Sequence, residues 1–263
     1  MPVLRMQIYQ PQAHYRIPFT YIRRHTYPIP PYSTIIGFLC NACGIDDQRM
    51  PLYNTIRELK ISISGMFKSK LTEMIWLRNV SQEAHKSTYG DIHNRVKNSQ
   101  LGHIGGQVPA HIDVLEDMEL IIYLYHDEES KLVELKQMIE NPVHRLQVLH
   151  IGRAEDWVVY KSIDLMDNSS FEYKRQDGNY PYFTWIPENI FTNNNNQIDW
   201  KDFEGLIYIL TTHSHIENYE EHMNNTGKRY YEKIRSKLNG GKIINSKCLF
   251  DRYLNIPVFL GDL

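Results

Sequence analysis

Residues 27–44 read YPIPPYSTIIGFLCNACG, and this stretch decides how the chain begins to fold. The prolines in its first half restrict the backbone and push the residues before them toward extended conformations, so a stiff extended segment is expected first. Ser33 or Thr34 can then cap a helix, because apolar residues recur at helical spacing up to Gly44, which suits a helix end. Gly37 lies inside this helix, where its missing side chain predicts close approach of a neighbouring backbone or a ligand.

Basic side chains lie just upstream of the expected helix start: Arg16, Arg23, Arg24 and His25. The first turn of a helix has unpaired N–H groups and the positive end of the helix dipole, so together with these cations it would suit a phosphate. The alternative is that Ser33 and Thr34 only cap the helix and that the basic side chains are solvated. The residues alone leave both interpretations open.

Length and composition favour a cytoplasmic globular protein. The 263 residues are 42% hydrophobic, which is enough for one large domain or two small ones. No apolar run approaches the roughly 18 residues of a membrane span, and the first residues lack a signal-peptide pattern. The 3 cysteines have no disulfide-like spacing and fit a reducing compartment.

Charge is distributed unevenly along the chain. Residues 1–111 hold 13 Lys plus Arg against 6 Asp plus Glu, a net charge of +7, whereas residues 112–263 hold 16 against 25, a net charge of −9. The basic first part predicts a polyanionic partner. The acidic second part is expected to face solvent or a basic protein neighbour rather than to bind nucleic acid along its whole surface.

The order of predicted elements indicates an α+β fold. Helices are expected at residues 33–43 and 128–140, and strands at residues 3–9, 58–67, 71–80, 119–126, 146–151 and 157–163. This order is that of a ferredoxin-like (RRM-like) antiparallel sheet with helices on one face.

Two regions do not belong to that pattern. Residues 81–108 lose all periodicity and are rich in His, Lys, Arg and Gly, so we interpret them as an arm projecting from the sheet. Later, a packed aromatic strand or loop is expected near residues 180–185, a strand at 203–211, and a charged helical or loop segment at 219–237. The predicted domains are therefore residues 1–165, with the arm inserted at about 81–110, and residues 166–263 as a β-rich C-terminal extension packed on them.

Metal and redox motifs find little support. Cys40 and Cys43 have Cys-x-x-Cys spacing, but they lie inside the expected helix without a second pair, which favours buried apolar cysteines. His213, His215 and His222 have loosely ligand-like spacing without a clear accompanying acid. The sequence also contains no phosphate-binding loop, nucleophile elbow or His-Glu-x-x-His motif. We therefore expect neither a metal site nor a cofactor.

Two kinds of RNA chemistry fit the available side chains. Cleavage without a metal needs a base, a cation and an acid, which could come from His25, Tyr27, Lys68, Lys70 and His103. Binding needs only cations for phosphates and flat rings for bases, and it could use Arg23, Arg24, Lys68, Lys70, Arg78, Tyr27 and Tyr32. Binding is the less demanding hypothesis.

Two motifs resemble those of the Cas5 family, the CRISPR-associated subunit of type I Cascade complexes within the RAMP superfamily. Residues 30–39 read PPYSTIIGFL and look like the family's Pro-Pro-x-Ser-Thr-x-x-Gly signature. Residues 150–156 read HIGRAED and are similar to its Leu-Gly-Arg-x-Glu stretch after the second helix. The resemblance covers roughly residues 1–165, and it looks most like the type I-B branch.

The resemblance implies a non-catalytic subunit that grips the 5′ handle of the CRISPR RNA (crRNA) and caps the Cas7 backbone. Its other implied neighbours are the large subunit Cas8 and target DNA, with no membrane contact, and the arm would correspond to the family's thumb. In the type I-C branch the family cuts precursor RNA, so a metal-independent endoribonuclease is the first alternative. A purely structural adaptor is the second.

These arguments give a set of candidate RNA-binding residues and no catalytic residue. The set is Arg16, Arg23, Arg24, His25, Tyr27, Tyr32, Ser33, Thr34, Gly37, Lys68, Lys70, Arg78, Lys86, Arg95, Lys97, His103 and Arg153.

Overall fold

The computed structural model describes residues 2–20, 23–78, 96–97, 100–101, 107–176, 180–192, 199–217, 228–242, 244 and 246–262. Its centre is one large sheet whose strands follow the order β11-β12-β10-β3-β7-β1-β8. These strands are Leu206–Glu217, Lys228–Gly240, Phe183–Pro187, Lys60–Met66, Gln107–Tyr125, Val3–Ala13 and Val159–Met166. All pairings along this path are antiparallel, so the prediction of an α+β fold with a large antiparallel sheet is confirmed.

Short segments complete this sheet and build a second one. The strand β15 (Gly261–Asp262) pairs with β3, while β2 (Arg23–Arg24) runs parallel to β7. A smaller sheet has the order β14-β13-β9, with bounds Ile256–Pro257, Cys248–Asp251 and Phe171–Lys174. Residues beyond 166 thus extend the main sheet through β10, β12 and β11 as well as forming their own.

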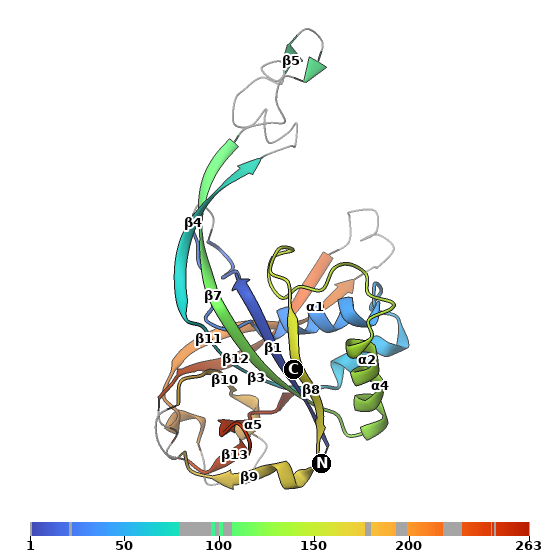
Figure 1. The fold of residues 1–263 in the computed structure, drawn as a ribbon, viewed down its shortest axis with the longest axis vertical. Coiled ribbons are helices and arrows are strands. Elements are labelled where there is room, and N and C mark those ends of the chain that lie inside the picture. Colours follow the sequence, from blue (N-terminus) through green and yellow to red (C-terminus); the bar gives the residue numbers. More distant parts are fainter. Residues whose placement is uncertain are drawn as a thin grey trace.

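The helices α1, α2 and α4 gather on one side of the sheet (Figure 1). Their bounds are Tyr32–Cys43, Pro51–Arg57 and Glu129–Glu140, and the short α5 spans Asn189–Thr192. Two 3-10 turns cover Asn168–Ser170 and Trp200–Asp202. The apolar faces of α1 and α4 bury Ile35, Leu39, Leu132 and Leu135 in the main core, where α1 contacts β11 and α4 contacts β8 and β1. No helix among the described residues is long and apolar enough to cross a membrane.

The start of α1 differs from the prediction. Extended Pro31 (φ −70°, ψ 161°) precedes a helix that begins at Tyr32, and no side chain caps it, so Ser33 and Thr34 are not caps. At the other end, Gly44 has φ 72° and ends the helix as predicted. Gly37 is exposed, and a Cβ placed there would meet no atom within 4 Å, so the predicted close approach of a neighbouring backbone is wrong.

Two other segments correct the predictions. Residues 146–151 form a loop with one isolated bridge instead of a strand, because Asn41 of α1 binds it: the Asn41 side chain accepts from Gln147 N at 2.9 Å. Residues 228–237 belong to β12 instead of a helical or loop segment, because β11 and β10 pair with this strand on both sides. The helix α2 was not predicted.

A long hairpin formed by β4 (Ser69–Arg78) and β7 rises from the main sheet (Figure 1). Its pairing runs from Ser69 opposite Glu116 to Arg78 opposite Gln107, so β7 begins inside the region predicted as a structureless arm. The short strands β5 (Val96–Lys97) and β6 (Gln100–Leu101) pair with each other. The rest of the predicted arm lies outside the described residues.

Candidate nucleic-acid interface

The carboxylate of Asp113 gathers basic side chains at the root of the β4–β7 hairpin. Asp113 lies in β7 with its side chain 2% exposed, and its Oδ1 accepts from Arg23 Nη2 and from Thr72 Oγ1, both at 3.1 Å. Its Oδ2 lies 2.9 Å from His25 Nδ1 and 3.8 Å from Lys70 Nζ. Because β2 and β4 flank β7 at this point, three segments distant in sequence supply one group of side chains. We call these five residues the Asp113 cluster.

Electrostatics keep the central carboxylate ionised. Burial raises the pKa of Asp113, but hydrogen bonds from His25 and Thr72 and the charges of Lys70 and Arg23 outweigh burial and lower it below its ordinary value. The side chains of Arg23, Lys70 and His25 remain 54%, 53% and 46% exposed. A buried anion thus holds these basic side chains in place while part of each one faces solvent.

The lowered pKa of Asp113 predicts a pH dependence of stability. The stabilisation from its ionised form is complete above the unfolded-state pKa of about 4 and is lost as the pH falls through the lower folded-state pKa. We expect Asp113→Asn to reduce the free energy of unfolding by about 1–3 kcal/mol at pH 6, and by less as the pH approaches 3. Urea denaturation at several pH values measures the free energy of unfolding. If this free energy depends on pH in the same way for Asp113→Asn and for the unmodified protein, the prediction is wrong.

Two more side chains beside the cluster have a buried nitrogen without a partner in the described part of the chain: the donor Nε of Arg24, and Nε2 of His14, which is the acceptor of a neutral ring because Nδ1 donates to a backbone oxygen. His14 Nδ1 bonds the backbone oxygen of Asp113 at 2.8 Å, so this pair adjoins the cluster. Burial, and then the charge of Arg16, lower the pKa of Arg24. A bound anion would offset both effects, because it would give the guanidinium a partner in a site that water cannot fully reach.

The face of the hairpin beyond the cluster carries exposed apolar side chains. Thr72, Met74 and Trp76 alternate onto one face of β4, and Thr72 contacts Asp113, so this face continues from the cluster. Met74 and Trp76 are 57% and 56% exposed. An exposed indole farther along the strand face that carries the cations suits single-stranded nucleic acids, which place bases on aromatic rings and phosphates on cations.

Arg153 lies in a tightly bonded loop instead of on this open face. Its guanidinium bonds Asp156 at 2.7 Å, lies 3.4 Å from Glu155, and is 15% exposed. The buried Asp156 also accepts from the backbone N–H groups of His14 and Arg153, and Gly152 adopts φ 110° where a Cβ would meet His14 O. The HIGRAED motif therefore forms a loop that Asp156 holds together. The Asp156 carboxylate binds the Arg153 guanidinium and the backbone N–H groups of His14 and Arg153.

The predicted contacts around α1 do not form an open site in this structure. Tyr27 and Tyr32 are buried, with Tyr27 packed edge-on against Trp185 and Tyr208, so neither ring is available to a base. The Ser33 hydroxyl bonds the Thr211 hydroxyl at 2.8 Å, which ties the first turn to β11. Thr34 and the exposed Gly37 lie on the same helix.

The remaining predicted residues fall into two groups. Arg16 is exposed and donates to Thr20 O at 3.2 Å, and Lys68 pairs with Asp117 at 3.1 Å at the opposite end of β4 from Trp76. Outside the described residues lie Lys86, Arg95 and His103, together with the side chains of Arg78 and Lys97.

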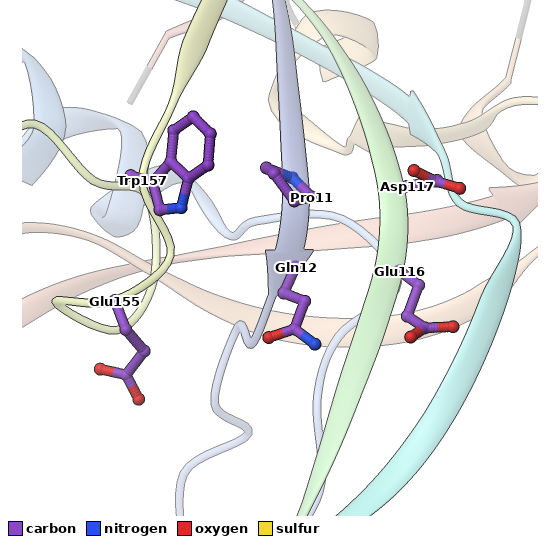
Figure 2. Close-up of a pocket in the computed structure, with 6 residues that line it drawn as sticks. All are labelled: Pro11, Gln12, Glu116, Asp117, Glu155 and Trp157. Carbon is purple, nitrogen blue, oxygen red and sulfur yellow. The ribbon is translucent and has the colours of Figure 1, made fainter.

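A pocket near Lys68 has the wrong charge for a phosphate. Figure 2 shows its lining, with Pro11 and Gln12 from β1, Glu116 and Asp117 from β7, and Glu155 and Trp157 from the segment before β8. Hydrogen bonds from Tyr9 and then Lys68 lower the pKa of Asp117, so that carboxylate is ionised. The pocket is acidic, whereas the Asp113 cluster presents cations.

Of the candidate metal ligands, Cys43 and His213 are buried, Cys40 is half-buried and His215 is exposed. Burial raises the pKa of Cys40 to about 11 and that of Cys43 to about 12, so both are protonated apolar side chains of α1. His213 is 1% exposed in β11, and burial lowers its pKa. His222 lies outside the described residues. Within the described part of the chain, no three metal-ligand side chains come together.

Comparison with protein families identifies the chain. The family model described as "CRISPR-associated protein (Cas_Cas5)" matches residues 3–236, which is most of the sequence. The chain belongs to the Cas5 family. The two motifs that resembled this family therefore led to the right assignment, although the first of them starts a helix that packs on β11 and the second forms an internal loop.

Solved structures agree with this Cas5 fold. One, described as "CRISPR RNA-guided surveillance complex", has a TM-score of 0.55 and 12% identity, covering 93% of this chain and 90% of the other. Another, "Crystal structure of Cas protein", has a TM-score of 0.50 and 12% identity, covering 99% and 100%. At this identity the likeness concerns the fold alone. No curated protein sequence matches the chain.

Proposed function

We propose that this Cas5 chain is a non-catalytic subunit of a type I Cascade complex, most similar to the type I-B branch, that binds the 5′ handle of the crRNA. It would cap the Cas7 backbone beside the large subunit Cas8, with target DNA nearby, in a cytoplasmic ribonucleoprotein that acts in antiviral defence. Membership of the Cas5 family and a structural neighbour described as an RNA-guided surveillance complex support an RNA-containing assembly.

The Asp113 cluster is the observation that carries the RNA contact. Arg23 and Lys70 are fixed by a buried carboxylate, so they lose little conformational freedom when a phosphate binds them. Trp76 and Met74 continue the same face with apolar surface for bases. The hairpin that carries this face fits the role of a thumb that closes over the guide.

The strand order supports a ferredoxin-like core for this subunit. The segments β1, α1, β3, β7, α4 and β8 follow one another in sequence, and the four strands lie in the spatial order β3-β7-β1-β8. Split β-α-β units of this kind place both helices on one face. The other face is covered in part by residues beyond 166, where Ile121 and Tyr123 pack with Phe171 and Ile256, so the attached hairpin is the surface left for RNA and neighbouring subunits.

One observation keeps the endoribonuclease alternative testable. His25 and Lys70 both approach Asp113, so a base and a cation lie near each other, whereas Tyr27 is buried and Lys68 bonds Asp117. We expect repeat RNA incubated with the purified chain and EDTA to stay intact, as judged by denaturing gels. A specific cut that His25→Ala abolishes would overturn the non-catalytic assignment.

The assembled complex offers the direct test of the proposed role. Co-expression of the chain with a CRISPR array and the other Cascade subunits, followed by sequencing of the copurified RNA, should recover crRNA. Crosslinks from the β4–β7 hairpin should map to the 5′ handle. Assembly with the partner subunits but without protection of the RNA 5′ end would instead favour a structural adaptor.

A further inference from the structure

The strand β12 concentrates positive charge in the acidic half of the chain. Its sequence, KRYYEKIRSKLNG, contains five basic side chains and a single acid, although residues 112–263 together hold 16 Lys plus Arg against 25 Asp plus Glu. The basic residues are Lys228, Arg229, Lys233, Arg235 and Lys237. A strand this basic is unexpected in a segment of net negative charge.

Successive side chains of β12 point to opposite faces of the sheet, so most of these charges lie on one face. Odd-numbered side chains from 229 to 237 point to one side of the sheet, so this side carries four of the five cations and Tyr231. The acid, Glu232, points to the other side and pairs with Arg57 at 3.0 Å. The acid of β11, Glu217, is opposite Lys228, which also belongs to that other side. Neither Glu232 nor Glu217 is therefore on the side of the odd-numbered cations.

The exposed part of this face runs from residue 229 to residue 235. Lys237 is excluded because it is buried, with its Nζ bonded to Trp200 O at 2.9 Å and Phe203 O at 2.8 Å. We call Arg229, Tyr231, Lys233 and Arg235 the β12 cationic stripe.

Neighbouring side chains orient the stripe and widen it. Arg235 lies 5.3 Å from the centre of the Trp200 ring and donates to Glu188 at 2.9 Å, yet its side chain is 54% exposed. Ile207 and Ile209 of β11 are opposite Lys237 and Arg235 and are 54% and 66% exposed. The stripe is thus flanked by apolar surface that water solvates poorly.

We infer that the β12 cationic stripe binds a single-stranded polynucleotide, with its cations on successive phosphates and Tyr231 stacked on a base. Cations along an extended strand follow a phosphate backbone, and an aromatic ring between them accepts any base. Tyr231 is 52% exposed between these cations, and the exposed Ile209 lies farther along the same face, opposite Arg235. The strands β10 and β3 separate β12 from β7, so this surface is distinct from the Asp113 cluster.

The test compares charge reversals on the two faces of one strand. Lys233→Glu reverses a charge in the stripe, and Lys228→Glu makes the same change on the opposite face. Binding of the full chain to labelled 20-nucleotide RNA and DNA of identical, non-repeat sequence is measured across a salt series. Lys233→Glu should weaken binding roughly tenfold and lower the salt slope by about 0.7 for each lost phosphate contact, whereas Lys228→Glu should change affinity less than about threefold.

A second pair of variants tests stacking. Tyr231→Ala should weaken binding of either strand roughly tenfold, because base–aromatic stacking contributes about that factor. Tyr230→Ala, on the opposite face where its hydroxyl bonds Glu217, serves as the control. Losses confined to RNA or to DNA would support the site and identify the polynucleotide that occupies it.

Several outcomes would overturn the inference. If Lys233→Glu and Lys228→Glu reduce polynucleotide affinity equally, binding depends on the net charge of the protein and not on a site on one face of β12. Unchanged polynucleotide binding together with loss of an acidic protein subunit from the assembled complex would favour protein docking. The handle proposal is tested separately, because a Lys233→Glu chain that still protects the crRNA 5′ end leaves that proposal standing.

Discussion

Replacing Arg23 and Lys70 together by alanine is expected to weaken binding of crRNA handle RNA about 10- to 100-fold at moderate salt. Each cation is held against the buried Asp113 carboxylate and offers its remaining donors to a phosphate, and a charge-assisted hydrogen bond contributes about 1.5–3 kcal/mol. The slope of log affinity against log salt should fall by roughly 0.7 for each phosphate contact that is lost. Fluorescence anisotropy with labelled handle RNA measures both quantities.

The control for this variant removes two other paired, exposed cations. Lys60 pairs with Asp262 and Lys242 with Glu204, so Lys60→Ala with Lys242→Ala makes the same change in net charge elsewhere. If both double variants reduce the affinity and the salt slope equally, the Asp113 cluster is not the RNA contact. Thermal unfolding of each variant separates a binding defect from a folding defect.

Replacing Trp185 by alanine is expected to lower the free energy of unfolding by about 3–5 kcal/mol. Trp185 lies in β10 and is fully buried, and its indole N–H donates to Pro30 O at 2.9 Å before the start of α1. Its ring contacts Tyr27 and Tyr208 edge-on, with centroids 5.9 and 5.5 Å away. It therefore joins the segment before α1 to two strands of the C-terminal part.

Trp185→Phe provides the comparison, because it keeps an aromatic ring while it removes the donor to Pro30 O and part of the ring volume. We expect it to cost about 1–3 kcal/mol. Urea unfolding followed by circular dichroism and by tryptophan fluorescence should give one coincident transition for the unmodified protein. A loss below about 1 kcal/mol for Trp185→Ala would instead indicate that residues beyond 166 fold independently of the first part.

The elements predicted correctly from the sequence carry their signal locally. α1 and α4 have apolar residues at helical spacing, and β1 and β3 alternate, so a short window is enough. β12 was missed because its first half is exposed on both faces and its stabilising partners, β11 and β10, are distant in the sequence. At 7 residues, α2 is too short to show a clear period.

In the candidate site too, local sequence features were predictable and contacts between distant residues were not. Its cations could be recognised from the basic run and from β4, but their common partner could not, because Asp113 lies 90 residues from Arg23 and 41 from Thr72. The aromatic rings were misjudged for a related reason. A Tyr beside prolines suits a core as well as a base, and only the packing against Trp185 decides that Tyr27 is buried.

The pair between Arg5 and Asp251 sets a limit on how the protein can fold as it is synthesised. Its partners are 246 residues apart, and Arg5 Nη1 and Tyr123 Oη both donate to the buried Asp251 carboxylate at 2.9 Å. At about 5–20 residues per second, roughly 12–50 s pass on the ribosome between the synthesis of the two partners. Until β10 is made, one edge of β3 has no partner, and its first residues wait longer for β15, which follows Asp251 in the chain. The nascent chain thus exposes a strand edge of the kind that chaperones protect from aggregation.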